Sequence, residues 1–385
     1  MTLSFKCELL EQSKIFINGK NMKTVLIYLP NLNCGGAESV TVRLANYLAG
    51  RGYLVKLITS IDGGPLEDIL DSRIEYLCLG LKNQWHTLFK MPSLIKRMKP
   101  DVIFTTMKES CFIMIVSKYI AFSNAKMVIR EANTISFQLK EEQKFVQRIK
   151  NYLIAISYRF ADKIIALSEE IKVDLVCSFH LSKEISVIPN PIGFDKMKKA
   201  IMSPLKHDAL NDNTILKLVT VARLYPQKNH LFMVNALAQY ININPNVKWF
   251  LVGNGPLKEE IKERVESLGI SDNVVFLGFQ ENPLATVNAC DVFVLPSLYE
   301  GFSNALLEAA ALNKKILVSD SQTTSVAFLN KLNIGSFYIN DNIDDFGKKL
   351  ESIVSSDEEQ DVSSRMRTEY SEEAVFNSYS KIMFE

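Results

Sequence analysis

Hydrophobic and polar positions alternate along the chain in blocks that predict strands and helices in turn. An apolar run at 24–30 precedes residues 37–50, whose apolar positions recur at helical spacing, and a second apolar run follows at 53–60. Further short apolar runs occur at 74–80, 101–107, 126–132, 163–168 and 185–190. Because several of these runs are apolar throughout and are separated by helices, they predict a parallel sheet covered on both faces.

The alternation restarts in the second half of the chain. Residues 190–213 contain prolines and lysines and show little hydrophobic periodicity, which indicates a connection between two domains. Strands are then expected at 216–224, 247–253, 273–279, 291–297 and 315–320, with helices at 230–241, at 256–268 and after Gly301. The predicted fold class is α/β, with two Rossmann-like parallel-sheet domains facing a cleft.

These patterns divide the chain into segments. We expect an N-terminal extension at 1–21, a first domain at 22–195, a linker at 196–213, a second domain at 214–365 and a C-terminal helix at 366–385 that packs back on the first domain. Val375, Tyr379 and Met383 share one face of that helix. A length of 385 residues agrees with two hydrophobic cores.

Charge is distributed unevenly between the two halves. The formal net charge is only +1, yet residues 1–200 carry 28 Lys and Arg against 19 Asp and Glu, while the remainder carries 16 against 24. A basic first half favours contact with an anionic membrane surface, a phosphate or a nucleic acid, and scattered solvated lysines are the alternative.

Cysteine and histidine positions limit the chemistry. The six cysteines are widely spaced with no C-x-x-C pair, which predicts reduced thiols in the cytoplasm. The four histidines show no ligand spacing, so we expect no metal site. The longest apolar run, 111–122, is too short to span a bilayer, and no signal-peptide pattern is present.

Two glutamates interrupt an otherwise small and apolar stretch at 297–312, SLYEGFSNALLEAAAL. Glu300 lies in the loop after an expected strand, and Glu308 lies about one turn inside the next helix, for which Ser303 and Asn304 are the candidate N-caps. Free amides at such a helix start favour an anion or a hydroxyl group, and carboxylates suit sugar diols. The alternative is an ordinary helix start whose acidic residues complement the dipole.

This E-x7-E spacing resembles the signature of retaining GT-B glycosyltransferases of the family 4 type (glycosyl transferases group 1). Other landmarks follow in the family's order: the glycine loop in NLNCGGAE, the R-x4-K pair in VARLYPQKNH and the G-x-G-P loop in FLVGNGPLKEEI. The resemblance covers about residues 22–320, and the ordered set is far more specific than any single motif.

The resemblance implies a nucleotide-sugar donor and roles for particular residues. Arg223 and Lys228 would stabilise the departing diphosphate, Glu300 would hold the hydroxyl groups of the donor sugar, and Glu308 would hold those of the ribose. Further donor contacts are implied for Gly253, Gly255, Gly301, Phe302, Ser303 and Asn304. No D-x-D triplet occurs, so with this basic pair we expect transfer without a metal or other cofactor.

On the acceptor side the family pattern is more variable. Gly35 and Gly36 would allow backbone close to a phosphate or acceptor, and REANT places Arg130 and Glu131 at the mouth of the expected cleft. The chain reads TTMKES where many relatives have a histidine, so no imidazole base can be assigned.

Two cationic amphipathic segments, 87–99 and 145–160, are expected either to cover the sheet or to contact an anionic membrane leaflet. With the basic first half, they favour peripheral attachment to the cytoplasmic face of a membrane, which suits a lipid-linked glycan acceptor.

The sequence therefore predicts a glycosyltransferase that moves a hexose or N-acetylhexosamine from a UDP-sugar to a carbohydrate acceptor in surface polysaccharide synthesis. GDP-mannose or another nucleotide sugar stays open as the donor. The scarcity of histidines disfavours a sugar-nucleotide epimerase, and the acidic second half disfavours a nucleic-acid-binding module.

Overall fold

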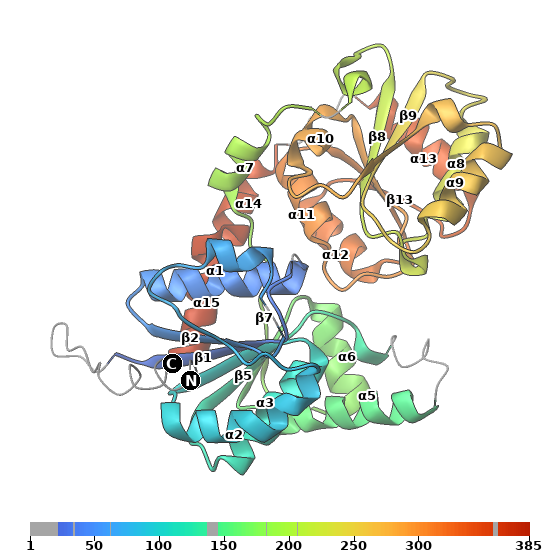
Figure 1. Ribbon diagram of the computed structural model, residues 1–385. Coiled ribbons are helices and arrows are strands. Elements are labelled where there is room, and N and C mark those ends of the chain that lie inside the picture. Colours follow the sequence, from blue (N-terminus) through green and yellow to red (C-terminus); the bar gives the residue numbers. More distant parts are fainter. Residues whose placement is uncertain are drawn as a thin grey trace. The chain divides into compact units, whose positions relative to one another are not determined.

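The computed structural model describes residues 22–33, 35–61, 63–136, 145–181, 183–205, 207–356 and 361–385 (Figure 1). The N-terminal extension expected at 1–21 lies outside these residues. The described chain forms two compact units. The first contains the described residues up to Ile129 together with Phe160–Asp162 and Phe384, and the second contains the described residues of Arg130–Arg159, Lys163–Met383 and Glu385.

Seven strands form the first sheet in the order β3-β2-β1-β4-β5-β6-β7. They are β1 (Thr24–Leu29), β2 (Leu54–Thr59), β3 (Glu75–Cys78), β4 (Val102–Thr106), β5 (Lys126–Glu131), β6 (Lys163–Ala166) and β7 (Ile185–Val187). The intervening helices are α1 (Gly36–Gly50), α2 (Thr87–Met98), α3 (Lys108–Ile120), α5 (Phe145–Ser157) and α6 (Glu169–Phe179). Strand β1 pairs in parallel with β2 and β4, and its apolar residues are buried, as its unbroken apolar run predicts.

Six parallel strands form the second sheet in the order β10-β9-β8-β11-β12-β13. They are β8 (Leu216–Val221), β9 (Val247–Val252), β10 (Val274–Gly278), β11 (Val292–Leu295), β12 (Lys315–Ser319) and β13 (Ser336–Tyr338). The helices are α8 (His230–Tyr240), α9 (Lys258–Ser267), α10 (Leu284–Ala289), α11 (Asn304–Ala311), α12 (Thr323–Leu332) and α13 (Ile343–Ser355).

Helices cover both faces of the second sheet (Figure 1). Trp249 of β9 packs in one hydrophobic cluster with α8, α9 and α13, whereas its neighbour Phe250 packs in another with α10, α11 and α12. Because successive side chains of a strand point to opposite faces, the two clusters lie on opposite sides of the sheet. This confirms the predicted fold class of two Rossmann-like α/β sheets.

Strand order locates the crevice in the second sheet. Chain connections from β8 run outward through β9 and β10, and the chain then returns to add β11 on the other side of β8. In open α/β sheets, ligands bind beyond the carboxyl ends of strands at such a switch point. Ligand-binding residues are therefore expected in the loops after β8 and β11.

The segments outside the two sheets are also ordered. The expected linker at 196–213 contains most of α7 (Phe194–Ala200) and the 3-10 turn η5 (Asp208–Asn211), and the tail forms α14 (Ser363–Tyr370) and α15 (Glu372–Phe384). The shared face predicted for Val375, Tyr379 and Met383 is confirmed, since all three are buried. Among the described residues, no helix has both the length and the apolar character that crossing a bilayer requires.

Candidate active site

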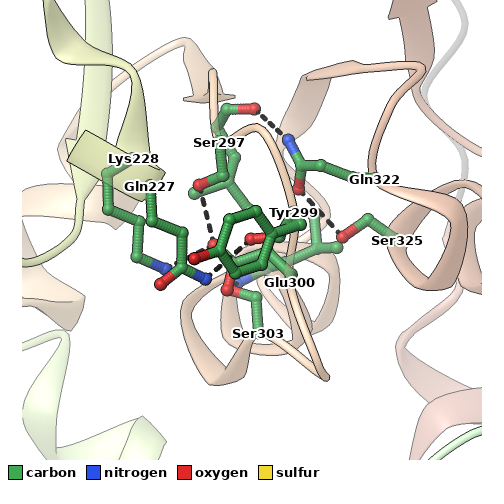
Figure 2. Close-up of polar contacts among 10 residues, drawn as sticks. Gln227, Lys228, Ser297, Tyr299, Glu300, Ser303, Gln322 and Ser325 are labelled. Carbon is green, nitrogen blue, oxygen red and sulfur yellow. Dashed lines mark hydrogen bonds and ion pairs between the residues drawn. The ribbon is translucent and has the colours of Figure 1, made fainter. Parts of the chain in front are cut away.

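The candidate site lies at the carboxyl ends of β8 and β11. After β8 the chain forms the 3-10 turn η6 (Pro226–Lys228), and after β11 a loop leads into α11. The two loops are joined by two hydrogen bonds. The Leu298 amide donates to the Gln227 carbonyl at 2.9 Å. Gln227 Nε2 donates to the Tyr299 carbonyl at 2.8 Å (Figure 2). These two hydrogen bonds thus fix the position of Lys228 relative to Glu300.

A partly buried ion pair between Lys228 and Glu300 is the central feature of the site (Figure 2). Lys228 Nζ donates to Oε1 of Glu300, and Ser297 Oγ donates to the same oxygen at 2.7 Å. The two charged side chains are 14% and 8% exposed. Because both of these bonds end on Oε1, the lone pairs of Oε2 can accept a hydrogen bond from a hydroxyl group.

The start of α11 presents backbone amides beside this pair. Ser303 is the N-cap, since its Oγ accepts from the Leu306 amide at 3.3 Å. Phe302 packs its ring edge-on against Phe328 with 5.6 Å between centroids, so its side chain belongs to the core and only its backbone can serve a ligand. Glu308 is half-buried about one turn further along the helix.

Three predicted donor-site glycines stand where a side chain has no room. A Cβ at Gly253 would lie 1.8 Å from the Ala222 carbonyl oxygen, and one at Gly255 would lie 2.4 Å from that of Leu224. Gly253 also has a φ of 147°, which side chains disfavour. These glycines let the loop after β9 pack on the loop after β8. Gly301 makes the same kind of approach, since its Cβ would lie 1.8 Å from the Ala132 carbonyl oxygen.

Arg223, the other predicted diphosphate ligand, is exposed on the loop after β8. Its guanidinium carbon lies 5.2 Å from the centroid of the Tyr225 ring, a cation–π contact. The structure therefore brings Lys228 and Glu300 together and leaves Arg223 at the surface of the same loop.

His230 lies just beyond Lys228 and is fully buried. Its ring stacks on Trp249 at 6.3 Å, and neither ring nitrogen has a hydrogen-bond partner among the described residues. Burial, with a smaller contribution from the Lys228 charge, lowers the pKa of His230 to about 3. The imidazole is therefore neutral at pH 7 and adds no charge beside the ion pair.

The residues predicted for the acceptor side lie in different units of the structure. Gly35 is the N-cap of α1 and Gly36 is its first residue, in the first unit. Arg130 and Glu131 end β5 and are 1% and 2% exposed. Side chains buried to this extent have little surface to offer an acceptor, and the bonds of Arg130 to Tyr379 and of Glu131 to the Asn133 amide lie inside the second unit.

Sequence reasoning missed several residues that shape the site. Ser297 lies within the stretch that drew attention to Glu300, and a hydroxyl three residues before a loop carboxylate is a local signal that could have been used. Gln227 had no such signal, because its partner Tyr299 is 72 residues away. The buried Gln322, whose Nε2 donates to the Leu295 carbonyl at the end of β11, also had no recognisable signal in the sequence.

Comparison with known proteins agrees with this architecture. The family models "Glycosyltransferase Family 4" and "Glycosyl transferases group 1" match residues 34–196 and 205–372. The N-acetylgalactosamine-N,N'-diacetylbacillosaminyl-diphospho-undecaprenol 4-alpha-N-acetylgalactosaminyltransferase of Campylobacter jejuni is 26% identical, covering 87% of this chain and 91% of its own length. The UDP-Gal:alpha-D-GlcNAc-diphosphoundecaprenol alpha-1,3-galactosyltransferase of Escherichia coli is also 26% identical, covering 83% and 84%. The crystal structure of Anabaena HepE in complex with UDP and glucose superposes with a TM-score of 0.76 at 17% identity, covering 94% of this chain and 99% of that one.

Two Rossmann-like parallel sheets, with a polar site at the switch point of the second, define the GT-B class of fold. Since both halves match the corresponding family models, the chain belongs to the GT4-type glycosyltransferases.

Proposed function

We propose that this protein transfers a hexose or N-acetylhexosamine from a UDP-sugar to a glycan carried on a lipid diphosphate, with retention at the anomeric carbon, in surface polysaccharide synthesis. The observation that carries the proposal is the Lys228–Glu300 pair beside the N-terminus of α11. The two relatives described above are named for acceptors on diphosphoundecaprenol, and the E. coli relative is named for UDP-Gal, which supports both substrate classes.

In the proposed reaction, the bond between the sugar C1 and the diphosphate oxygen breaks and its electron pair leaves with the diphosphate. Lys228 and Arg223 stabilise the negative charge that develops there, and the amides at the start of α11 add positive potential. The acceptor hydroxyl oxygen bonds to C1, and its proton passes to the departing diphosphate. These basic groups take the electrostatic role that a metal has in other glycosyltransferases, so activity should persist in EDTA.

A membrane-bound acceptor requires a membrane-facing surface, and α5 offers one. Phe145, Ile149, Tyr152 and Leu153 are exposed at helical spacing on one side of this helix, and we call them the α5 stripe. Of the two alternatives for 87–99, covering the sheet is favoured, because Met91 and Ile95 on its apolar side are fully buried. The proposed peripheral contact with the cytoplasmic face of a membrane therefore rests on the α5 stripe.

The test is a transfer assay with radiolabelled UDP-hexoses, UDP-N-acetylhexosamines and GDP-mannose on a synthetic undecaprenyl-diphosphate sugar. We expect an extended lipid-linked product with stoichiometric release of UDP. Transfer from GDP-mannose alone would make the donor assignment wrong. An epimerised nucleotide sugar without release of nucleoside diphosphate would indicate the epimerase instead.

A further inference from the structure

Arg130 and Glu131 are two consecutive charged residues at the end of β5, both buried within the second unit. Arg130 Nε donates to the hydroxyl of Tyr379 at 3.1 Å, and Arg130 Nη2 donates to Oδ1 of Asn190 at 2.5 Å. Tyr379 belongs to α15 and is fully buried. Since a buried guanidinium needs its donors satisfied, these contacts hold it in one orientation.

A hydrogen bond continues from this group to the signature helix. Asn190 Nδ2 donates to Oδ1 of Asn304, the first residue of α11, at 2.7 Å. Arg130 can only donate, so it fixes which end of the Asn190 side-chain amide faces it. The other end, the NH2 group, therefore points to Asn304.

Glu131 makes a second connection to the same segment. Its Oε1 accepts from the amides of Ala132 and Asn133, each at 2.9 Å, and its Oε2 accepts from the hydroxyl of the buried Tyr158 at 2.6 Å. This carboxylate thereby fixes the turn whose Ala132 carbonyl lies against Gly301.

We propose that Arg130 and Glu131 are positioning residues of the donor site. Arg130 acts through Asn190 on Asn304, and Glu131 acts through Ala132 on Gly301. Together they hold the segment 301–304 in the conformation that presents its amides to the diphosphate. This inference rests on the proposed function, and it replaces direct contact with the acceptor as the role of these two residues.

Three tyrosine-to-phenylalanine variants test the proposal, because each removes one hydroxyl from a buried ring. Tyr379→Phe removes the acceptor of Arg130 Nε, and Tyr158→Phe removes the donor to Glu131 Oε2. Tyr338→Phe is the matched control, because the Tyr338 hydroxyl has no hydrogen-bond partner among the described residues. The dissociation constant for UDP is measured by calorimetric titration, and steady-state kinetics are measured with donor and acceptor varied separately.

For Tyr379→Phe and Tyr158→Phe, we expect the UDP dissociation constant and the donor KM to rise about three- to tenfold, the effect of one hydrogen bond. The acceptor KM should not change, and Tyr338→Phe should match the wild type. A purely structural role would lower only the amount of folded enzyme, reducing kcat with both KM values unchanged, and that result would overturn the proposal. A wild type that binds no UDP would instead contradict the proposed donor.

Discussion

Glu300 is a partly buried carboxylate whose charge is paired before any ligand binds. Taking a carboxylate out of water costs free energy, which the Lys228 ammonium and the Ser297 hydroxyl offset. Removing one partner of a fully buried pair typically costs about 3–5 kcal/mol and an exposed pair contributes about 0–1 kcal/mol, so this partly buried pair lies between the two. Lys228 is therefore held in place before a ligand arrives, so little reorganisation accompanies the reaction.

Lys228→Ala should lower the rate of UDP release about 10²-fold or more, the usual effect of losing one group that stabilises developing charge. Glu300→Gln, which keeps the shape and removes the charge, should also depress turnover. Lys262→Ala is the control, because Lys262 pairs with Glu259 at 3.3 Å on the surface of α9. Wild-type kinetics for Lys228→Ala would show that the role assigned to this lysine is wrong.

The buried His230 should make folding stability depend on pH. Its pKa is about 3 in the folded protein and 6.5 in the unfolded chain, so only the unfolded state gains the proton between these values. The contribution of the neutral His230 to the free energy of unfolding is fully present above pH 6.5 and is lost as the pH falls toward 3. Between pH 7.5 and 5 the wild type should lose about 2 kcal/mol more than His230→Phe.

Urea unfolding at the two pH values measures that difference. His230→Phe keeps a ring next to Trp249 and cannot titrate. Equal pH dependence of the unfolding free energy in the two proteins would contradict the argument.

At the scale of elements, the approach of Gly301 to Ala132 sets the start of α11. Gly301→Ala would place its Cβ 1.8 Å from a backbone oxygen, so the chain has to shift. We expect a loss of about 1–3 kcal/mol in the free energy of unfolding, with reduced UDP binding. Gly347→Ala in α13 is the control, since nothing lies within 4 Å of its Cβ position, and it should gain about 0.5–1 kcal/mol. Unchanged UDP binding in Gly301→Ala would contradict the proposed use of this segment.

The strands around the site were predictable because β11 is apolar throughout and four of the six residues of β8 are apolar, as burial on both faces favours. The sequence did not predict the three-residue β13. The orientation of α2 could not be predicted either, since a cationic amphipathic helix has the same pattern whether its apolar side meets a sheet or a lipid.

The site was predictable only in part, because local spacings can be read from the sequence and contacts between distant residues cannot. Lys228 and Glu300 stand at recognisable spacings from neighbouring residues, so the sequence indicated both. The burial of Arg130 could not be predicted, because its partner Tyr379 lies 249 residues away in α15. A charged residue at the end of a strand looks the same in sequence whether it faces a ligand or a distant helix.

At the scale of the whole molecule, charge and exposed apolar surface point to the same partner. The first 200 residues hold an excess of nine positive charges, and the α5 stripe lies within them. Basic residues attract an anionic leaflet at roughly 1 kcal/mol each near its surface, and large apolar side chains add roughly 1.5–3 kcal/mol each if fully buried. Stable anchoring generally needs two such contributions, so we expect attachment only where both act together.

Vesicle flotation tests this argument directly. The protein should float with phosphatidylglycerol vesicles at low salt and less at high salt, because salt screens exposed charges with a Debye length of about 10 Å at 0.1 M. Ile149→Glu with Leu153→Glu in the α5 stripe should abolish flotation. Ile243→Glu changes an equally exposed apolar residue beyond α8, so it should leave flotation intact. Transfer to a short water-soluble acceptor should be the same in all three proteins, because none of these side chains belongs to the donor site. Absence of binding to anionic vesicles even at low salt would remove the membrane from the proposal while leaving the transferase chemistry untouched.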